Sequence, residues 1–199
     1  MLDGKVVDAD RVVSSDSEEL ILVDQDDNEI GFLDKKRCHD GLGLPHRAFS
    51  LFIFNQKGEL LLQKRSANKR LWPLFWSNSC CSHPRRGESL RVATQRRLNE
   101  ELGIETPLEF IYKFAYHAQF GDLGSESEVC SVFIGRSERK VATNPNEIES
   151  VRYLSRDQLD DELRTRPEQF TPWFKMEWHR LNTEFETQLN NYSANYSDS

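Results

Sequence analysis

The sequence predicts a fold of mixed α and β structure, of the α/β or α+β class. Helices are expected to pack against a mixed sheet and form an α/β/α sandwich. Strand-like runs alternate with helical segments, and no repeat or heptad pattern is present in the sequence. With 199 residues, 37% of them hydrophobic, the chain can bury one core without disulfides. We expect a single domain over 1–189, with 1–34 as an N-terminal β extension, followed by a polar, disordered tail at 190–199.

Alternation of apolar and polar residues, together with apolar runs bounded by turn residues, predicts the strands. Asp26-Asp27-Asn28 is expected to be the turn of a first hairpin, and Asn55-Gln56-Lys57-Gly58 the turn of a second. Residues 66–86 contain Pro73 and Pro84 and are expected to form a loop. Strands or hairpins are expected at 20–33, 47–54, 59–64, 108–118 and 127–135.

Capping residues predict three helices. The first covers about 88–102 and ends at Gly103, a residue suited to the left-handed backbone that follows many helices. The second opens with Ser155 and Gln158, which match a capping box, and runs to about 163. The third opens with Thr171-Pro172, a cap followed by proline, and runs to about 185.

The overall charge and the first residues narrow the class of protein. A net charge of −7 argues against nucleic acid as the main partner. Residues 1–17 lack the apolar run of a signal peptide, and no segment has the roughly twenty apolar residues of a membrane span. We therefore expect a cytoplasmic protein without a membrane partner, whose four cysteines are reduced thiols. The sequence does not predict an oligomeric state.

Two charged residues fall within the apolar arc of the first helix. At about 100° per residue, Arg97 and Glu101 lie about 20° on either side of Leu90. One interpretation is a buried ion pair within the helix, which is costly to desolvate. The other, which we favour, is that both residues face a polar site beneath the helix.

A thiol and an imidazole stand close together before this helix. Cys81 and His83 lie in the run Ser77-Asn78-Ser79-Cys80-Cys81-Ser82-His83-Pro84. A thiol can carry a proton on and off carbon, and an imidazole can bind a divalent metal. Successive residues of an extended segment point to opposite sides, so Cys81 and Cys80 cannot both face one site.

Further candidate metal ligands occur elsewhere in the chain. His39 and His46 bracket a Gly/Pro-containing loop, and Glu126 and Glu128 share one face of a predicted strand. Individually, each histidine suits a surface or hydrogen-bonded position, and Glu-x-Glu is commonly a solvated strand face. Together with His83 they would form a set of three histidines and two carboxylates.

Basic residues cluster around the same loops. In an acidic chain, such a cluster beside a metal site indicates a small anionic ligand such as a diphosphate, although ordinary surface charge accounts for some of it. Trp72, Trp76 and Trp173 are typical of a core, but an indole ring can also stabilise a carbocation. The basic residues are Lys35, Lys36, Arg37, Lys64, Arg65, Lys69 and Arg70.

The helix region resembles a Nudix box. The general pattern is Gly-x5-Glu-x7-Arg-Glu-hydrophobic-x-Glu-Glu-x-Gly-hydrophobic, and here it runs from Ser82 through Glu88 to Ile104. Ser82 replaces the first Gly, and Arg97 replaces the Glu that follows Arg96. Nudix hydrolases normally use that missing carboxylate to bind magnesium. The resemblance implies a Nudix-type α/β/α sandwich.

Within that superfamily, the chain resembles the type 1 isopentenyl diphosphate isomerases, over roughly 30–180. The family usually has Cys-Gly-His-Pro where this chain has Cys81-Ser82-His83-Pro84. The combination of motifs is much more specific than the Nudix box alone. The matching stretches are His39 through His46-Arg47-Ala48-Phe49-Ser50, Trp72-Pro73, Ser77 to Pro84, Glu126 to Cys130, and Thr171-Pro172-Trp173.

The resemblance implies a role for each matched residue. Cys81 would be the catalytic thiol, with Glu128 and Tyr116 as the acid–base pair on the opposite face of the substrate. Glu101 would help to bind a magnesium ion that touches the diphosphate, and Trp173 would face the cationic centre. The metal, which can be manganese, zinc or magnesium, would be bound by His39, His46, His83, Glu126 and Glu128. The diphosphate oxygens would be bound by Lys35, Arg65, Lys69 and Arg97.

The chemistry of that reaction suits these residue types. Moving a carbon–carbon double bond needs one proton delivered and another removed, with no redox cofactor. Two other functions compete. A Nudix hydrolase would account for the box and the basic cluster but not for Cys81 or the histidines. A catalytically silent binding protein on the same scaffold would leave Cys81, Glu128 and Trp173 without a role.

Overall fold

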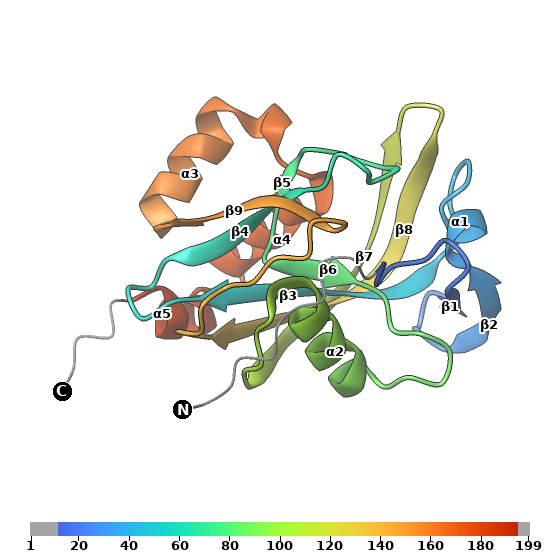
Figure 1. The fold of residues 1–199 in the computed structure, drawn as a ribbon, viewed down its shortest axis with the longest axis horizontal. Coiled ribbons are helices and arrows are strands. Elements are labelled where there is room, and N and C mark those ends of the chain that lie inside the picture. Colours follow the sequence, from blue (N-terminus) through green and yellow to red (C-terminus); the bar gives the residue numbers. More distant parts are fainter. Residues whose placement is uncertain (1–11, 195–199) are drawn as a thin grey trace.

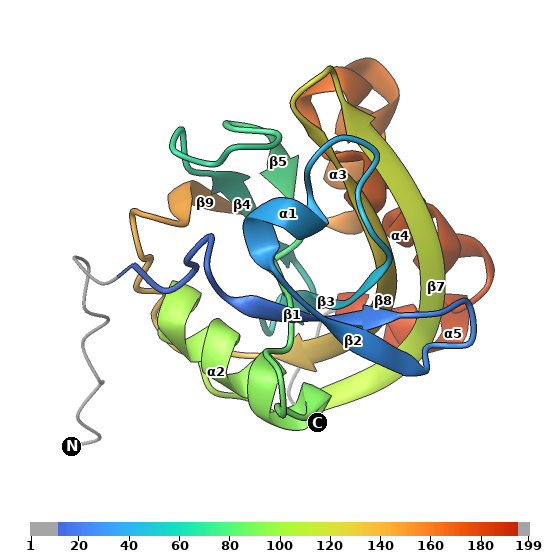
Figure 2. The ribbon, with the colours of Figure 1, turned by 90° about the vertical axis from the view of Figure 1, so that its right-hand side faces the viewer.

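The computed structural model describes residues 12–194, which form a mixed nine-stranded sheet with helices on both faces (Figures 1 and 2). Its architecture confirms the predicted α/β/α sandwich. The strands are β1 (Glu19–Val23), β2 (Glu29–Asp34), β3 (His46–Phe54), β4 (Leu60–Arg65), β5 (Trp76–Ser77), β6 (Cys80–Ser82), β7 (Leu108–Phe120), β8 (Gly124–Arg136) and β9 (Ile148–Leu154). The helices are α1 (Lys35–Cys38), α2 (Leu90–Leu102), α3 (Arg156–Thr165), α4 (Pro172–Thr183) and α5 (Glu186–Ser193), with a 3-10 turn at Pro167–Gln169.

Strand β3 is the centre of the sheet. It pairs in parallel with β8 along its whole length, from His46 opposite Glu128 to Phe54 opposite Arg136. It also pairs antiparallel with β1, β6 and β4 at successive points. An almost continuous apolar sequence suits a strand that is covered on both faces. The site described below lies where β1, β3, β6 and β8 meet.

The two faces of the sheet bury separate cores. Phe49, Leu51 and Ile53 of β3 point toward α2, where they meet Leu98 and Leu102. The alternate residues of β3 pack with α3, α4 and α5 on the other face, and Figure 2 shows these helices across the sheet from α2. Because side chains alternate along a strand, the position of a residue in β3 decides in which of the two cores it is buried.

The predicted end of α2 and the capping box of α3 are confirmed, whereas α2 begins at Leu90 and Thr171 makes no side-chain capping hydrogen bond to α4. Ser89 accepts a hydrogen bond from the backbone of Val92, and Gly103 takes the left-handed conformation after α2, with φ of 67°. Ser155 and Gln158 form the complete capping box of α3. None of the helices in the described part of the chain is long and apolar enough to cross a membrane.

Several short elements differ from the predictions. Residues 66–86 are not all loop, because β5 and β6 form there by pairing with β4 and β3. Strand β9 and helix α1 were not predicted, and α5 includes 190–193, the start of the predicted tail. A strand of two or three residues is too short to show an alternating sequence pattern, so it can be recognised only from its pairing with other strands. Residues 1–11 and 195–199, the ends of the predicted extension and tail, lie outside the described residues.

Candidate active site

A cavity of about 300 Å³ opens beside the edge of the sheet where β6 and β8 flank β3. Segments distant in sequence contribute its walls: the start of the described chain, α1, the loop after β4, β6, β8 and the beginning of α4. Candidate site residues that line it are Lys35, His39, Arg65, Lys69, Cys81, His83, Arg97, Tyr116, Glu126, Glu128 and Trp173. Acidic, basic, thiol and aromatic groups therefore share one hollow.

Five predicted metal ligands converge at one end of this cavity. Their ligand atoms all lie within 4.8 Å of one another. His39 Nε2 lies 2.8 Å from Glu126 Oε2, and His83 Nε2 lies 2.8 Å from Glu128 Oε1. The five residues are His39, His46, His83, Glu126 and Glu128, a group that could hold a divalent metal.

Backbone contacts orient two of the imidazoles. Nδ1 of His39 lies 2.6 Å from the carbonyl of Lys35, and Nδ1 of His46 lies 2.7 Å from the carbonyl of Leu44. Because a carbonyl can only accept, each Nδ1 carries the hydrogen, and a neutral ring then presents a free lone pair on Nε2. Outer contacts of this kind fix the ring orientation of metal-binding histidines.

An unsatisfied atom of the group fits a metal ion. Buried His46 Nε2 has no hydrogen-bond partner among the described residues, and buried polar atoms are normally paired. Burial alone would lower the pKa of His39, but the carboxylate of Glu126 raises it above its ordinary value. Burial and the neighbouring imidazoles of His46 and His39 lower the pKa of His83 well below its ordinary value. The carboxylates therefore favour positive charge in this group, either on His39 or on a bound cation.

Glu128 links this group to a phenol. Its Oε2 accepts a hydrogen bond of 2.6 Å from the hydroxyl of Tyr116, while Oε1 faces His46 and His83. The antiparallel register places Tyr116 of β7 directly opposite Glu128 of β8. Burial raises the pKa of Tyr116 well above its ordinary value, so the phenol keeps its proton and can donate it only when charge develops nearby.

The adjacent cysteines face different parts of the molecule. Cys80 is completely buried in the core beneath α2, whereas Cys81 is partly exposed and lines the cavity. Burial raises the pKa of Cys81 to about 12, although the guanidinium of Arg65, 3.9 Å from the sulfur, opposes this effect. At neutral pH the Cys81 thiol is protonated.

An aromatic wall stands beside the thiol. Trp173 is 2% exposed and packs edge-on against Trp72, with ring centroids 5.2 Å apart. The guanidinium carbon of Arg65 lies 5.2 Å from the Trp173 centroid, so this ring already faces one cation. Arg65 is fixed by hydrogen bonds to the carbonyls of Leu71 and Trp72.

The other end of the cavity is cationic. Lys35, Lys69 and Arg97 line it together. Burial and the charges of Lys69 and Arg97 lower the pKa of Lys35 to about 8. Glu147 contacts Lys69 and lies 3.1 Å from Arg97 Nη2, and Glu101 and Glu100 also pair with Arg97, but of these three carboxylates only Glu147 lines the cavity. This end therefore suits an anionic group.

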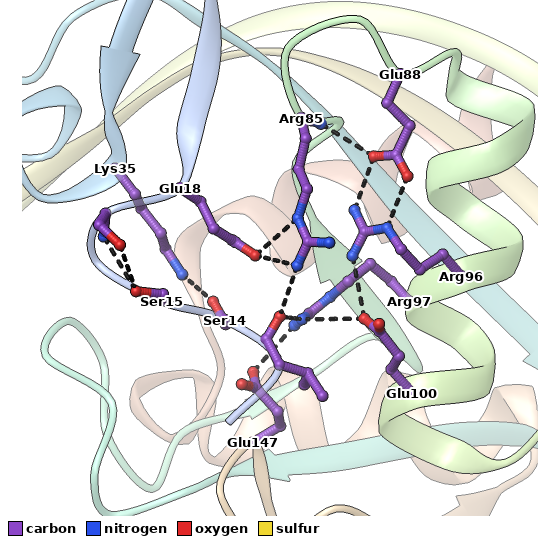
Figure 3. Close-up of polar contacts among 12 residues, drawn as sticks. Ser14, Ser15, Glu18, Lys35, Arg85, Glu88, Arg96, Arg97, Glu100 and Glu147 are labelled. Atoms are coloured by element: carbon purple, nitrogen blue, oxygen red, sulfur yellow. Dashed lines mark hydrogen bonds and ion pairs between the residues drawn. The ribbon is translucent and has the colours of Figure 1, made fainter. Parts of the chain in front are cut away.

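The start of the described chain lies over the cationic end (Figure 3). Lys35 donates to the hydroxyl of Ser14, and Arg97 Nη1 donates to the carbonyl of Val13 at 2.5 Å. Arg85 holds the same segment through Val13 and Glu18. Residues 12–16 therefore contact the cations that an anionic ligand would use.

Three carboxylates of the Nudix-like motif, Glu88, Glu100 and Glu101, pair with arginines, and Figure 3 shows the first two. Both oxygens of Glu88 accept hydrogen bonds from Arg96, at 2.7 and 2.8 Å, and Glu100 lies 3.0 Å from the same guanidinium. Arg97 Nη2 donates to Glu101 Oε1 at 2.6 Å. Arg97 and Glu101 thus form the buried ion pair, so the favoured interpretation is wrong for Glu101, which does not line the cavity, and holds only for Arg97, which does.

Most predicted site residues therefore lie around one cavity. Two do not line it: His46 lies behind the other metal ligands, and Glu101 lies beneath Arg97. Sequence analysis missed Glu147, which is 3% exposed, and the fully buried Glu177. Glu147 follows an irregular loop without periodicity, and Glu177 stands among the aromatic residues of α4, where it breaks the apolar face.

The fold and the helix motif define the class of protein. The model of the NUDIX domain matches residues 44–174. Solved structures with this fold include DR0079 from Deinococcus radiodurans, with a TM-score of 0.62 and 24% identity, covering 75% of this chain and 90% of that one. The MutT protein from Methanosarcina mazei Go1 has a TM-score of 0.60 and 21% identity, covering 71% and 96%.

More similar sequences define the family within that class. Isopentenyl-diphosphate Delta-isomerase 1 of Photorhabdus laumondii is 42% identical over 164 residues, which is 81% of this chain and 93% of the relative. Isopentenyl-diphosphate Delta-isomerase of Serratia proteamaculans is 47% identical over 158 residues, 79% of this chain and 87% of the relative. The chain belongs to the isopentenyl-diphosphate Delta-isomerase family of Nudix proteins.

Proposed function

We propose that the protein interconverts isopentenyl diphosphate and dimethylallyl diphosphate, as an isomerase of isoprenoid biosynthesis. The observation that carries this proposal is the presence of two separate proton-bearing groups, Cys81 and the Tyr116–Glu128 pair, in one cavity with a cationic end. A diphosphate bound by Lys35, Lys69 and Arg97 would leave the hydrocarbon part near the thiol and the phenol. Arg65 contacts both the Cys81 sulfur and the Trp173 ring.

The reaction needs a proton on one carbon and removes another from its allylic neighbour. Glu128 and Tyr116 serve one face of the substrate, where the phenol is hydrogen-bonded to the carboxylate and can relay a proton. Cys81 serves the other face, where its sulfur gives or takes the second proton. No electrons are transferred, so the chemistry requires no redox cofactor.

The predicted metal ligands lie on the side of the substrate served by Glu128 and Tyr116. A magnesium, manganese or zinc ion bound by the three histidines, Glu126 and Glu128 would supply positive charge and fix the Glu128 carboxylate. Glu128 would therefore present its oxygen to Tyr116 in a constant orientation. We also propose that Glu101 helps to bind a magnesium ion that accompanies the diphosphate.

The intermediate would be a tertiary carbocation. Trp173 presents a largely buried indole ring in the cavity wall, and aromatic faces attract cations. Tyr116 also lines the cavity, with its ring centroid 6.4 Å from that of Trp173, and Trp72 packs against Trp173 with ring centroids 5.2 Å apart. These rings exclude water that would otherwise capture the cation.

Incubation with isopentenyl diphosphate and magnesium tests the function directly. We expect dimethylallyl diphosphate without phosphate release, because Arg97 stands where Nudix hydrolases have a magnesium-binding carboxylate. Arg97→Ala should weaken substrate binding and should not create hydrolysis. Hydrolysis of nucleoside diphosphate compounds without isomerisation would establish a hydrolase instead, and no conversion of either substrate would leave a binding protein.

A further inference from the structure

Residues 12–18, which we call the N-terminal strap, form one wall of the cavity. Val12, Ser14 and Asp16 of the strap line the cavity together with Lys35 and Lys69 of its cationic end. With the strap in this position, the cavity still has a volume of about 300 Å³. The strap therefore borders the space for an anionic ligand and does not fill it.

Val13 fixes the first part of the strap. Its side chain is 4% exposed, and its carbonyl accepts hydrogen bonds from two guanidinium groups, from Arg97 Nη1 at 2.5 Å and from Arg85 Nη2 at 3.3 Å (Figure 3). Hydrogen bonds from charged donors are stronger than those between neutral groups. Arg85 does not line the cavity, so its contact with Val13 can remain when a ligand binds there.

Glu18 fixes the other end of the strap. Arg85 Nε donates to Glu18 Oε1 at 2.9 Å, and the Glu18 carbonyl accepts a hydrogen bond from the backbone of Lys35 at 2.8 Å. The carbonyl of Asp16 accepts another from the backbone of Lys36 at 3.1 Å. One guanidinium group, that of Arg85, therefore joins both ends of the strap, and the residues between them are held beside the cavity.

Ser14 brings a hydroxyl group to the cations of the cavity. Its Oγ accepts a hydrogen bond from Lys35 Nζ, and Lys35 is its only hydrogen-bond partner among the described residues. Because an ammonium group only donates, the Ser14 hydroxyl keeps its own hydrogen for another acceptor. Asp16 also belongs to this wall, but it is exposed, so water and salt screen its repulsion of an anion. Ser14 and Lys35 therefore present a neutral and a charged donor side by side.

We propose that Ser14 is a further substrate-binding residue, whose hydroxyl donates a hydrogen bond to a diphosphate oxygen, and that Arg85 is a positioning residue that acts through the strap; this rests on the proposed function. An anion bound in this way completes the hydrogen bonding of Ser14 without displacing Lys35 from it. Arg85 does not touch the ligand and controls its affinity by holding Val13 and Glu18.

A strap that obstructs the cavity predicts the opposite behaviour. Its carbonyl and hydroxyl oxygens accept hydrogen bonds from Arg97 and Lys35, so an obstructing strap would compete with an anion for these donors. Loosening such a strap would strengthen anion binding. Loosening a strap that forms part of the binding site weakens it. Removal of the Ser14 hydroxyl or of the Arg85 guanidinium therefore distinguishes the two roles.

Calorimetric titration with magnesium pyrophosphate measures anion binding without turnover. Ser14→Ala is expected to raise the dissociation constant about tenfold, the loss typical of one hydrogen bond to a charged group. Ser14→Thr, which keeps the hydroxyl, should restore binding. Arg85→Gln should cause a loss of similar size, and the double variant should bind no more weakly than the weaker single variant, because Arg85 acts through the strap.

Two matched controls and a kinetic measurement separate this role from a structural one. Ser17→Ala changes an exposed serine of the strap outside the cavity wall, and Arg86→Gln changes an arginine that pairs with Glu19 of β1. Both controls should bind pyrophosphate as the unmodified protein does. With isopentenyl diphosphate, Ser14→Ala should raise KM by the same factor and leave kcat and the melting temperature nearly unchanged.

Pyrophosphate binding that is unchanged or tighter in Ser14→Ala or in Arg85→Gln would overturn the proposal. An unmodified protein that binds no pyrophosphate would overturn it as well. If pyrophosphate binding follows the expected pattern but the unmodified protein does not isomerise isopentenyl diphosphate, the proposed function fails, while Ser14 and Arg85 keep their roles in an anion-binding site.

Discussion

The adjacent residues Cys80 and Cys81 differ only in the face of β6 on which they lie. Cys80 is packed under α2, where burial raises its pKa well above the ordinary value. Cys81 lies on the opposite face, beside the cavity and opposite Ser50. Strand alternation therefore separates an inert thiol from one that can contact a substrate.

Substitution of each cysteine by alanine tests this assignment. Cys81→Ala is expected to reduce isomerisation by at least about a hundredfold, since it removes one of two proton-transfer groups, with no change in the folded state. Cys80→Ala should cost about 1 kcal/mol of stability through a small cavity and keep most of the activity. Rates measured at saturating substrate, with circular dichroism as the control for folding, decide the matter. Comparable losses in both variants would contradict the role of Cys81.

Helix α2 and the loop before β9 are joined by buried charges. Arg97 is 2% exposed and lies between Glu101 and Glu147, at 2.6 and 3.1 Å. Burial alone would raise the pKa of Glu147, but Lys69 and Arg97 lower it to about 2. This ion-pair cluster holds cavity cations in place and contributes stability as well as binding.

Removing Glu147 should make the protein less stable at neutral pH but not in acid. Because its pKa is lowered in the folded state, its stabilisation is complete above about pH 4.5 and is lost as the pH falls toward 2. Glu147→Gln should therefore lower the free energy of unfolding by about 3 kcal/mol at pH 7, and the difference should shrink near pH 3. Urea denaturation at both pH values measures it, with exposed Glu149→Gln of β9 as the control. A difference independent of pH would exclude this charge effect.

The metal ligands join four parts of the whole molecule. His39 caps the end of α1, His46 opens β3, His83 follows β6, and Glu126 and Glu128 belong to β8. Without a cation, this group places three imidazoles and two carboxylates together in a largely buried region. Metal binding should therefore stabilise the folded chain as well as orient Glu128.

Metal removal should lower the melting temperature of the protein. Treatment with chelator is expected to shift it downward by several degrees, and added manganese or zinc should restore it. His83→Ala should lose most of the bound metal, as measured by mass spectrometry of the purified protein. The control is His117→Ala, an exposed residue of β7 outside the group. Full metal content in His83→Ala would contradict the ligand set.

The sequence alone allowed much of the architecture and the chemistry to be predicted. The alternating strands around β3 and the capped helices follow from local patterns, whereas the grouping of the histidines with Glu126 and Glu128 was implied by the resemblance to the isomerase family. Local patterns suffice there because periodicity and capping act between residues a few positions apart.

Only the tertiary structure decided the remaining features. The short strands β5 and β6 exist through pairing with distant strands, and Glu147 and Glu177 gain their unusual environments from neighbours far along the chain. It also decided that Arg97 both pairs with Glu101 and reaches the cavity. The burial of a side chain and the charges near it depend on its neighbours in space. The local sequence around these residues does not identify those neighbours, because they lie far along the chain.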